Sequence, residues 1–153
     1  MIKVLFVCHG NICRSPMAEF IFRDMVKKEN ISDKIEIASC AVSREELGNP
    51  VYYAAKEKLN EMGISCMGKT ARIITKRDYN NYDYILAMED KNISGITKIT
   101  GEDKDKKVFK LLDFAGGGNI SDPWYTRDFD RTAQDIIKGC KGFLSYLKEN
   151  NEI

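Results

Sequence analysis

Four short apolar runs alternate along the chain with longer segments in which apolar residues recur every three or four positions. A continuous apolar run is typical of a strand buried on both faces of a sheet, and the wider spacing is typical of an amphipathic helix. The predicted strands are residues 2–7, 35–39, 83–88 and 106–111. The predicted helices are residues 16–30, 50–63, 75–80, 90–98 and 128–150.

Strands that alternate with helices predict right-handed βαβ units and a parallel sheet. The expected fold class is therefore α/β: a single domain over residues 1–153, with a four-stranded parallel sheet flanked by helices on both faces in a Rossmann-like three-layer sandwich. Ligands of such sheets bind beyond the carboxyl ends of the strands. The polar residues that follow the predicted strands at this edge are Cys8 to Ser15, Ser39, Glu89 and Asp122.

Length and composition narrow the class of protein. The 153 residues suffice for one domain with its own core, and a net charge of +1 predicts neither a nucleic-acid partner nor a membrane-surface partner. No apolar run approaches the roughly 20 residues of a membrane span, and residues 1–7 are short for a secretory signal. The five cysteines match no disulfide scaffold or zinc pattern, which favours reduced thiols in a cytoplasmic protein without a metal.

The segment from Cys8 to Ser15 (CHGNICRS) lies between the first apolar run and Pro16, which suits the first position of a helix. Backbone N–H groups of such a loop can converge on an oxyanion, and Arg14 at its end offers a bidentate fork to two more oxygens. A helix N-terminus and a nearby cation favour the thiolate form of a cysteine, so Cys8 needs no partner base. The sequence therefore predicts Cys8 as a nucleophile aimed at phosphorus.

Other residues of the loop have structural interpretations beside the chemical ones. Gly10 permits backbone conformations that strain other residues, and Asn11 tolerates a left-handed one. Ser15 suits both a hydroxyl donor to the Cys8 sulfur and a plain helix N-cap. Taken alone, Cys8 is more simply a small buried residue that ends a core strand, and Arg14 a surface arginine paired with a carboxylate. The combined spacing favours the catalytic interpretation.

Residues 114–125 carry three consecutive glycines and the sequence Asp-Pro-Trp-Tyr, which predicts an irregular loop. A phosphoester leaving group needs a proton, and Asp122 is a suitable donor that can then activate water against a phosphocysteine intermediate. The simpler interpretation is a turn aspartate before proline. Trp124 and Tyr125 favour the catalytic role as stacking walls for an aromatic substrate, although they also suit a loop anchored into the core.

Segments 7–16, 82–88 and 122–125 together resemble the low-molecular-weight protein tyrosine phosphatases, in the same order and spacing over nearly the whole chain. The resemblance implies hydrolysis of protein phosphotyrosine and of small aryl phosphates. It also implies Cys8 as nucleophile, Arg14 as phosphate ligand and Asp122 as general acid, with neither a metal nor an organic cofactor.

By the same resemblance, Ser39 hydrogen-bonds Asn11 and supports the loop, while Trp124 and Tyr125 flank a phosphotyrosine ring. A phosphate or similar oxyanion is the implied ligand of the loop. The loop residues implied to surround it are His9, Gly10, Asn11, Ile12, Cys13 and Ser15. A reversible Cys8–Cys13 disulfide is also implied, and the alternative is that Cys13 only packs under the loop.

The chain departs from the family pattern around the expected substrate mouth. Lys69 stands where the family often has a histidine, and Glu45 or Glu46 replaces a frequent aromatic residue. Glu89 takes the place of a family aspartate, and His9 that of an aliphatic residue. These changes alter the shape and charge of the mouth rather than the reaction.

Other functions fit parts of the pattern. A protein-arginine phosphatase of the same family is the nearest, but the resemblance links that activity to threonine at the position of Ile12. Arsenate reduction needs relaying cysteines, and residues 67–139 contain none. A cysteine phosphocarrier would share the loop without needing Asp122. A non-catalytic phosphotyrosine-binding module has no use for Cys8, Arg14 and Asp122 together.

Overall fold

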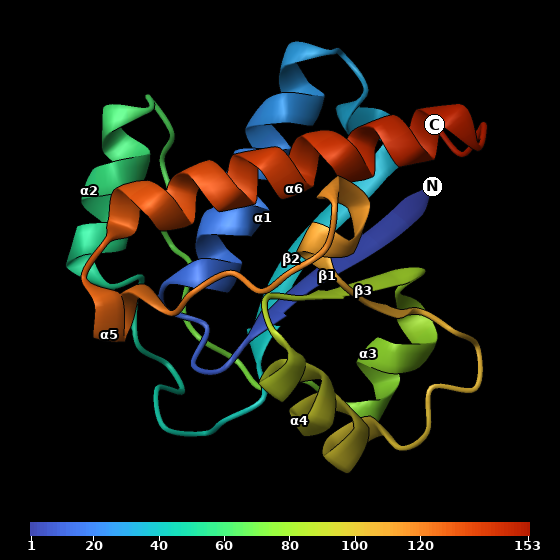
Figure 1. Ribbon diagram of the computed structural model, residues 1–153, viewed down its shortest axis with the longest axis horizontal. Helices are drawn as coiled ribbons and strands as arrows, with labels where there is room; N and C mark the ends of the chain where they lie inside the picture. Colours follow the sequence, from blue (N-terminus) through green and yellow to red (C-terminus); the bar gives the residue numbers. More distant parts are fainter.

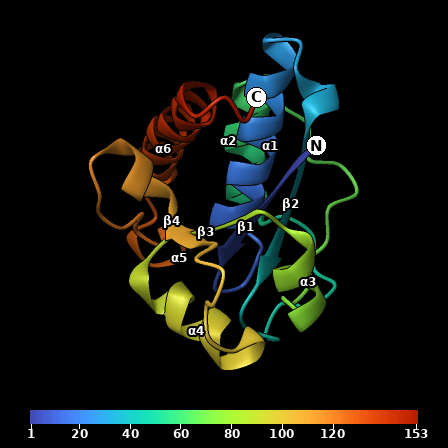
Figure 2. The ribbon, with the colours of Figure 1, turned by 90° about the vertical axis from the view of Figure 1, so that its right-hand side faces the viewer.

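The computed structural model describes residues 1–153 and contains one parallel sheet between two layers of helices (Figures 1 and 2). The sheet order is β2-β1-β3-β4, with β1 (Ile2–Cys8), β2 (Ile35–Ala41), β3 (Tyr84–Ala87) and β4 (Val108–Lys110). The helices are α1 (Arg14–Lys28), α2 (Tyr53–Glu61), α3 (Lys76–Asn81), α4 (Asp90–Thr100), α5 (Pro123–Thr126) and α6 (Phe129–Glu149), with 3₁₀ turns η1 (Ser32–Lys34) and η2 (Leu111–Ala115). The predicted α/β fold class is confirmed.

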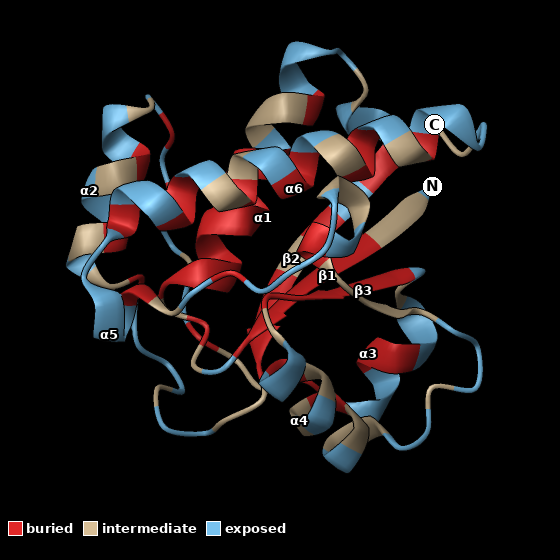
Figure 3. Cartoon of the chain, in the orientation of Figure 1, coloured by how far each residue is buried: buried red, intermediate tan, exposed pale blue.

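Apart from Lys3 near its start, strand β1 is apolar because both of its faces are covered. Val4 and Phe6 point to the larger core under α1, α2 and α6, whereas Leu5 and Val7 point to the smaller core under α3 and α4. Figure 3 shows the buried sheet between the two helical layers. Strand β1 pairs with β2 on one side and with β3 on the other. Its carboxyl end, at Cys8, therefore lies in the middle of the sheet edge formed by the strand ends.

Several predicted bounds are wrong. The second helix begins at Tyr53 rather than Pro50, because Pro50 forms an isolated bridge with Thr70 and the Tyr52 N–H donates to the Ile12 carbonyl. Helix α1 begins at Arg14, and Ser15 makes no cap hydrogen bond, so the N-cap interpretation of Ser15 is wrong. The expected irregular loop contains α5 and the end of η2. Ser39 lies inside β2 rather than at its end.

None of the helices has both the length and the apolar character needed to cross a membrane.

Helix α6 packs against η2 at a glycine that leaves no room for a side chain. A Cβ added at Gly142 would lie 2.1 Å from the Phe114 carbonyl oxygen, a backbone atom. We therefore expect Gly142→Ala to destabilise the fold by a net ~2 kcal/mol, since overpacking of 1–3 kcal/mol or more outweighs the roughly 1 kcal/mol gain in helix propensity. Thermal unfolding should show a Tm about 4–8 °C lower.

Lys141→Ala, an exposed neighbour on α6, is the matched control and should leave the Tm nearly unchanged. An unchanged Tm in Gly142→Ala would contradict the close approach of α6 and η2.

Candidate active site

Strand β1 delivers Cys8 to a loop that leads directly into α1 at Arg14. Asn11 has a φ of 61°, the left-handed conformation that its residue type tolerates. Gly10 does not have a positive φ, so the loop does not use the conformational freedom that a glycine permits at this position. A Cβ there would lie 3.4 Å from the Glu46 side chain. Backbone N–H groups of Val42 and Ser43 donate to the His9 carbonyl and tie the loop to the end of β2.

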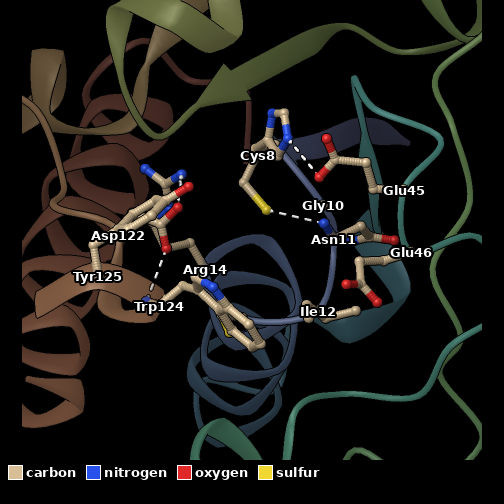
Figure 4. Close-up of a pocket in the computed structure, with 12 residues that line it drawn as sticks. Cys8, Gly10, Asn11, Ile12, Arg14, Glu45, Glu46, Asp122, Trp124 and Tyr125 are labelled. Atoms are coloured by element: carbon tan, nitrogen blue, oxygen red, sulfur yellow. Dashed lines mark hydrogen bonds and ion pairs between the residues drawn. The ribbon is translucent and has the colours of Figure 1, made fainter. Parts of the chain in front are cut away.

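The sulfur of Cys8 lies at the floor of the cavity, within reach of hydrogen-bond donors of the loop (Figure 4). The Asn11 N–H is 3.3 Å from Sγ, the Ser15 N–H 3.4 Å and the Ser15 Oγ 3.0 Å. Such donors stabilise a negative charge on the sulfur. Cys8 is 2% exposed and belongs to the core cluster, and it also lines the cavity above the loop. The residue is therefore buried in the protein and still accessible from the cavity.

Arg14 is buried rather than on the surface, against the simpler sequence interpretation. Its Nη1 donates to the Ile120 carbonyl at 3.0 Å and pairs closely with Glu89. Its Nη2 lies 3.3 Å from Asp122 Oδ2. A guanidinium fixed from two sides presents its donors in one orientation, which suits recognition of a phosphoryl group.

Asp122 comes from the other side of the cavity, where it is the N-cap of α5. Its Oδ1 accepts from the Trp124 N–H at 3.0 Å, which fixes the carboxylate near Arg14. The 114–125 segment returns over the sheet edge because the Ile120 N–H donates to the Met88 carbonyl beyond β3. Asp122 therefore lies at the same edge as Cys8, as the sequence predicted.

The aromatic side of the cavity is braced by one arginine. Arg127, with a φ of 60°, stacks over the rings of Tyr52, Trp124 and Phe129 and donates to the Tyr52 hydroxyl at 2.8 Å. Trp124 remains 45% exposed and Tyr125 82% exposed. The exposed rings offer a surface for an aromatic group at the mouth.

These parts enclose a cavity of about 200 Å³ (Figure 4). Asp122, Trp124 and Tyr125 lie on one side, and Glu45 and Glu46 lie on the other. The loop residues that line it are Cys8, His9, Gly10, Asn11, Ile12, Cys13 and Arg14. The Glu45 carboxylate pairs with His9 at 3.2 Å, so His9 faces the rim rather than the sulfur.

Ser15 and Ser39 lie beneath the loop rather than in the cavity wall. The expected hydrogen bond from the Asn11 amide to the Ser39 hydroxyl is present at 3.0 Å. Sequence reasoning missed Glu19, which accepts from Ser39, and it missed the bracing by Tyr52 and Arg127. Glu19 carried one available signal: it follows Ser15 by four residues and so shares its face of the predicted helix.

All five cysteines are free thiols in the structure. Burial, together with the neighbouring Cys8 and Asp122 charges, raises the pKa of Cys13 to about 12. Burial also raises the pKa of Cys40, Cys66 and Cys140 above the ordinary thiol range. At neutral pH these four residues are protonated thiols. No cluster of three or more metal-ligating side chains is present.

A cysteine sulfur held by convergent amide donors, with an arginine and an aspartate over it at the edge of a parallel sheet, is the arrangement of a cysteine-dependent phosphatase. Comparison with known proteins agrees. The family model described as low molecular weight phosphotyrosine protein phosphatase matches residues 3–153. The chain belongs to this family of cysteine-dependent protein tyrosine phosphatases.

Individual relatives cover nearly the whole chain. The low molecular weight protein-tyrosine-phosphatase YfkJ of Bacillus subtilis is 37% identical over 156 residues, 100% of both chains, and its crystal structure superposes with a TM-score of 0.94 over 98% of this chain and 96% of that one. The human low molecular weight phosphotyrosine protein phosphatase is 38% identical over 93% of each chain. A Drosophila arginine phosphatase has a TM-score of 0.87 at 28% identity, covering 96% of this chain and 98% of its own.

Proposed function

We propose that the protein hydrolyses phosphotyrosine in proteins, and small aryl phosphate monoesters, through a phosphocysteine intermediate on Cys8. The observation that carries this proposal is the geometry around one sulfur: amide donors from Asn11 and Ser15 below, and the Arg14–Asp122 pair above. Nucleophile, phosphate ligand and proton donor thus face one cavity. Family membership of the whole chain supports the same reaction.

In the first step the Cys8 thiolate attacks phosphorus and the bond from phosphorus to the ester oxygen breaks. Asp122, protonated, gives its proton to the departing phenolic oxygen. Arg14 and the backbone N–H groups of the 8–15 loop bind the three phosphoryl oxygens, where negative charge is spread in the transition state. The products of this step are the free phenol and a phosphocysteine.

In the second step the Asp122 carboxylate takes a proton from water as the water oxygen attacks phosphorus. The sulfur–phosphorus bond breaks, and the electron pair returns to Cys8 as thiolate. The Ser15 hydroxyl, 3.0 Å from the sulfur, stabilises that leaving thiolate. Phosphate leaves, and Asp122 is protonated again for the next cycle. No redox partner is needed.

Phosphotyrosine is favoured over phosphoarginine by the residues at the mouth. Trp124 and Tyr125 expose ring surface beside Asp122, which suits an aromatic ester. Ile12 is apolar and offers no hydrogen bond to a guanidinium. A cysteine phosphocarrier would have no need of Asp122 near Arg14. We place the enzyme in the cytoplasm, because five free cysteines suit a reducing compartment.

The proposal is tested with two peptides of the same sequence, one carrying phosphotyrosine and one phosphoarginine, assayed for phosphate release with a chelator present. We expect phosphotyrosine to be cleaved with a kcat/KM at least about tenfold higher, and the chelator to have no effect. Faster release from phosphoarginine would overturn the substrate class. Loss of turnover with chelator would overturn the mechanism.

A further inference from the structure

One lysine outside the cavity ties the loop that carries Asp122 to the sheet. Lys110 is the last residue of β4 and pairs with Ala87 of β3, so its backbone is fixed. Its Nζ lies 3.1 Å from Asp90 Oδ1 and donates to Asn119 Oδ1 at 3.2 Å. We call these three residues, Lys110, Asp90 and Asn119, the Lys110 cluster. The reaction steps described above use none of them.

Asn119 and the first residue of α4 are also joined directly. Asn119 Oδ1 accepts from the Asp90 N–H at 3.2 Å, and the Asn119 side-chain amide donates to Asp90 Oδ2 at 3.3 Å. Hydrogen bonds from Lys110 and Asn119 hold the pKa of the Asp90 carboxyl below its usual range, so this group is charged at neutral pH. One ammonium group therefore joins the end of β4, the start of α4 and the loop.

The segment before Asn119 supplies no stiffness of its own. Residues 116–118 are exposed glycines with φ of 97°, 90° and 111°, and glycine restricts the backbone less than any other residue. The path of the chain toward Asp122 is therefore set by the contacts made from Asn119 onward rather than by the chain that precedes it.

Ile120 gives the loop one fixed point, and Asn119 gives it a second. The Ile120 side chain is buried, and its N–H donates to the Met88 carbonyl at 2.9 Å. A single anchored residue still lets the chain turn about it, whereas two adjacent anchored residues set the direction in which the chain continues. That direction places Asp122, two residues further on, and a general acid must lie within hydrogen-bond reach of the leaving oxygen.

Arg14 has a support that does not involve the lysine. Its partner Glu89 is the N-cap of α4, and Asn92 Oδ1 accepts from the Met88 and Glu89 N–H groups at 3.1 and 3.0 Å. These bonds hold Glu89 in place whether or not Lys110 is present. Loss of the lysine should therefore disturb the general acid and leave phosphate binding by Arg14 nearly intact.

We infer that Lys110 is a positioning residue for protonation of the leaving group: through Asn119 it sets the place of the Asp122 carboxyl at the cavity. Lys110 does not line the cavity, so it has no direct contact with substrate. The Asp90 side chain is 71% exposed, and an ion pair so open to water contributes little to stability. The inference rests on the proposed function, in which Asp122 is the general acid.

The test compares two esters that differ in their need for a proton. The kcat/KM is measured for a phosphotyrosine peptide and for p-nitrophenyl phosphate with Lys110→Met, which keeps the length of the side chain and loses its charge. We expect kcat/KM for the peptide to fall about tenfold, a part of what the acid itself contributes. The value for p-nitrophenyl phosphate should fall less than about threefold, because nitrophenolate leaves readily without a proton. Inhibition by inorganic phosphate should stay within about twofold of the wild type.

Matched variants separate positioning from a general loss of structure. In an Asp122→Asn background, Lys110→Met should cause no further loss with the peptide, because the acid through which it acts is already absent. Lys110→Arg keeps a cation that can reach both partners, and should hold the peptide rate within about twofold of the wild type. Lys107→Met removes a partly buried lysine directly before β4, where it donates to the Tyr79 carbonyl at 2.8 Å, and should leave the ratio of the two esters unchanged.

Equal losses on the two esters in folded Lys110→Met, or no loss on either, overturn the inference, as does a further loss in the Asp122→Asn background. Weakened inhibition by phosphate also overturns it, because the defect would then lie in the phosphate site. If Lys110→Met does not fold, Asn119→Ala carries the same expectation at an exposed position. The proposed function fails by a different result: turnover by Cys8→Ser, or a wild-type peptide rate in Asp122→Asn, whatever Lys110→Met does.

Discussion

Cys8→Ser is expected to lose turnover of p-nitrophenyl phosphate by on the order of 10⁴ or more, the scale seen when a covalent nucleophile is removed from other hydrolases. A hydroxyl is a far weaker nucleophile than a thiolate at neutral pH, and no base lies beside it to activate it. His9, the only histidine of the chain, pairs instead with Glu45 at the rim.

The same variant should still bind phosphate, because the guanidinium of Arg14 and the backbone N–H groups of the 8–15 loop remain. Phosphate should therefore raise the Tm of Cys8→Ser, as it does for any ligand that binds only the folded state. Cys66→Ser is the matched control: Cys66 is buried away from the cavity, and its variant should keep activity within about twofold. Turnover by Cys8→Ser near the wild-type rate would rule out the phosphocysteine.

Asp122→Asn should slow phosphotyrosine hydrolysis by roughly 10²–10⁴, the usual contribution of a positioned general acid. Asparagine keeps an oxygen to accept from the Trp124 N–H, so the α5 cap is preserved while the proton is lost. The loss should be smaller for p-nitrophenyl phosphate, because nitrophenolate leaves without a proton far more readily than the phenolate of tyrosine. The measurement is kcat for both substrates at the pH optimum.

Asp128→Asn serves as the control for this experiment. Asp128 caps α6 by accepting from the Arg131 N–H, and asparagine caps helices equally well. Its variant should keep wild-type rates on both substrates. An equal loss on the two esters in Asp122→Asn would indicate a displaced loop rather than a missing proton.

The parts of the fold that could be predicted from the sequence are those written in local patterns. The apolar run before Cys8, the spacing to Arg14 and the Asp-Pro pair at Asp122 each placed an element or a side chain at the correct edge of the sheet. Strand lengths and helix periodicity are properties of consecutive residues, so they can be predicted without knowing which distant segments these elements pack against.

The errors arose where partners distant in sequence decide the local structure. Pro50 suits a helix start, but the segment from Pro50 to Tyr52 pairs instead with Thr70 and Ile12. Ser15 suits an N-cap, but its hydroxyl is taken by Cys8 and Asn11. Neither competitor is visible in a local window of sequence.

The interior position of β1 separates a stable part of the site, which carries Cys8, from a surface part that tolerates substitution. A strand paired on both sides and covered on both faces opens only when the whole protein unfolds, and Cys8 is attached to it. Glu45 and Glu46 belong to a surface connection, where substitutions are absorbed at low cost in stability. Substitutions at the rim can therefore change the substrate preference of such an enzyme during evolution while its nucleophile stays in place.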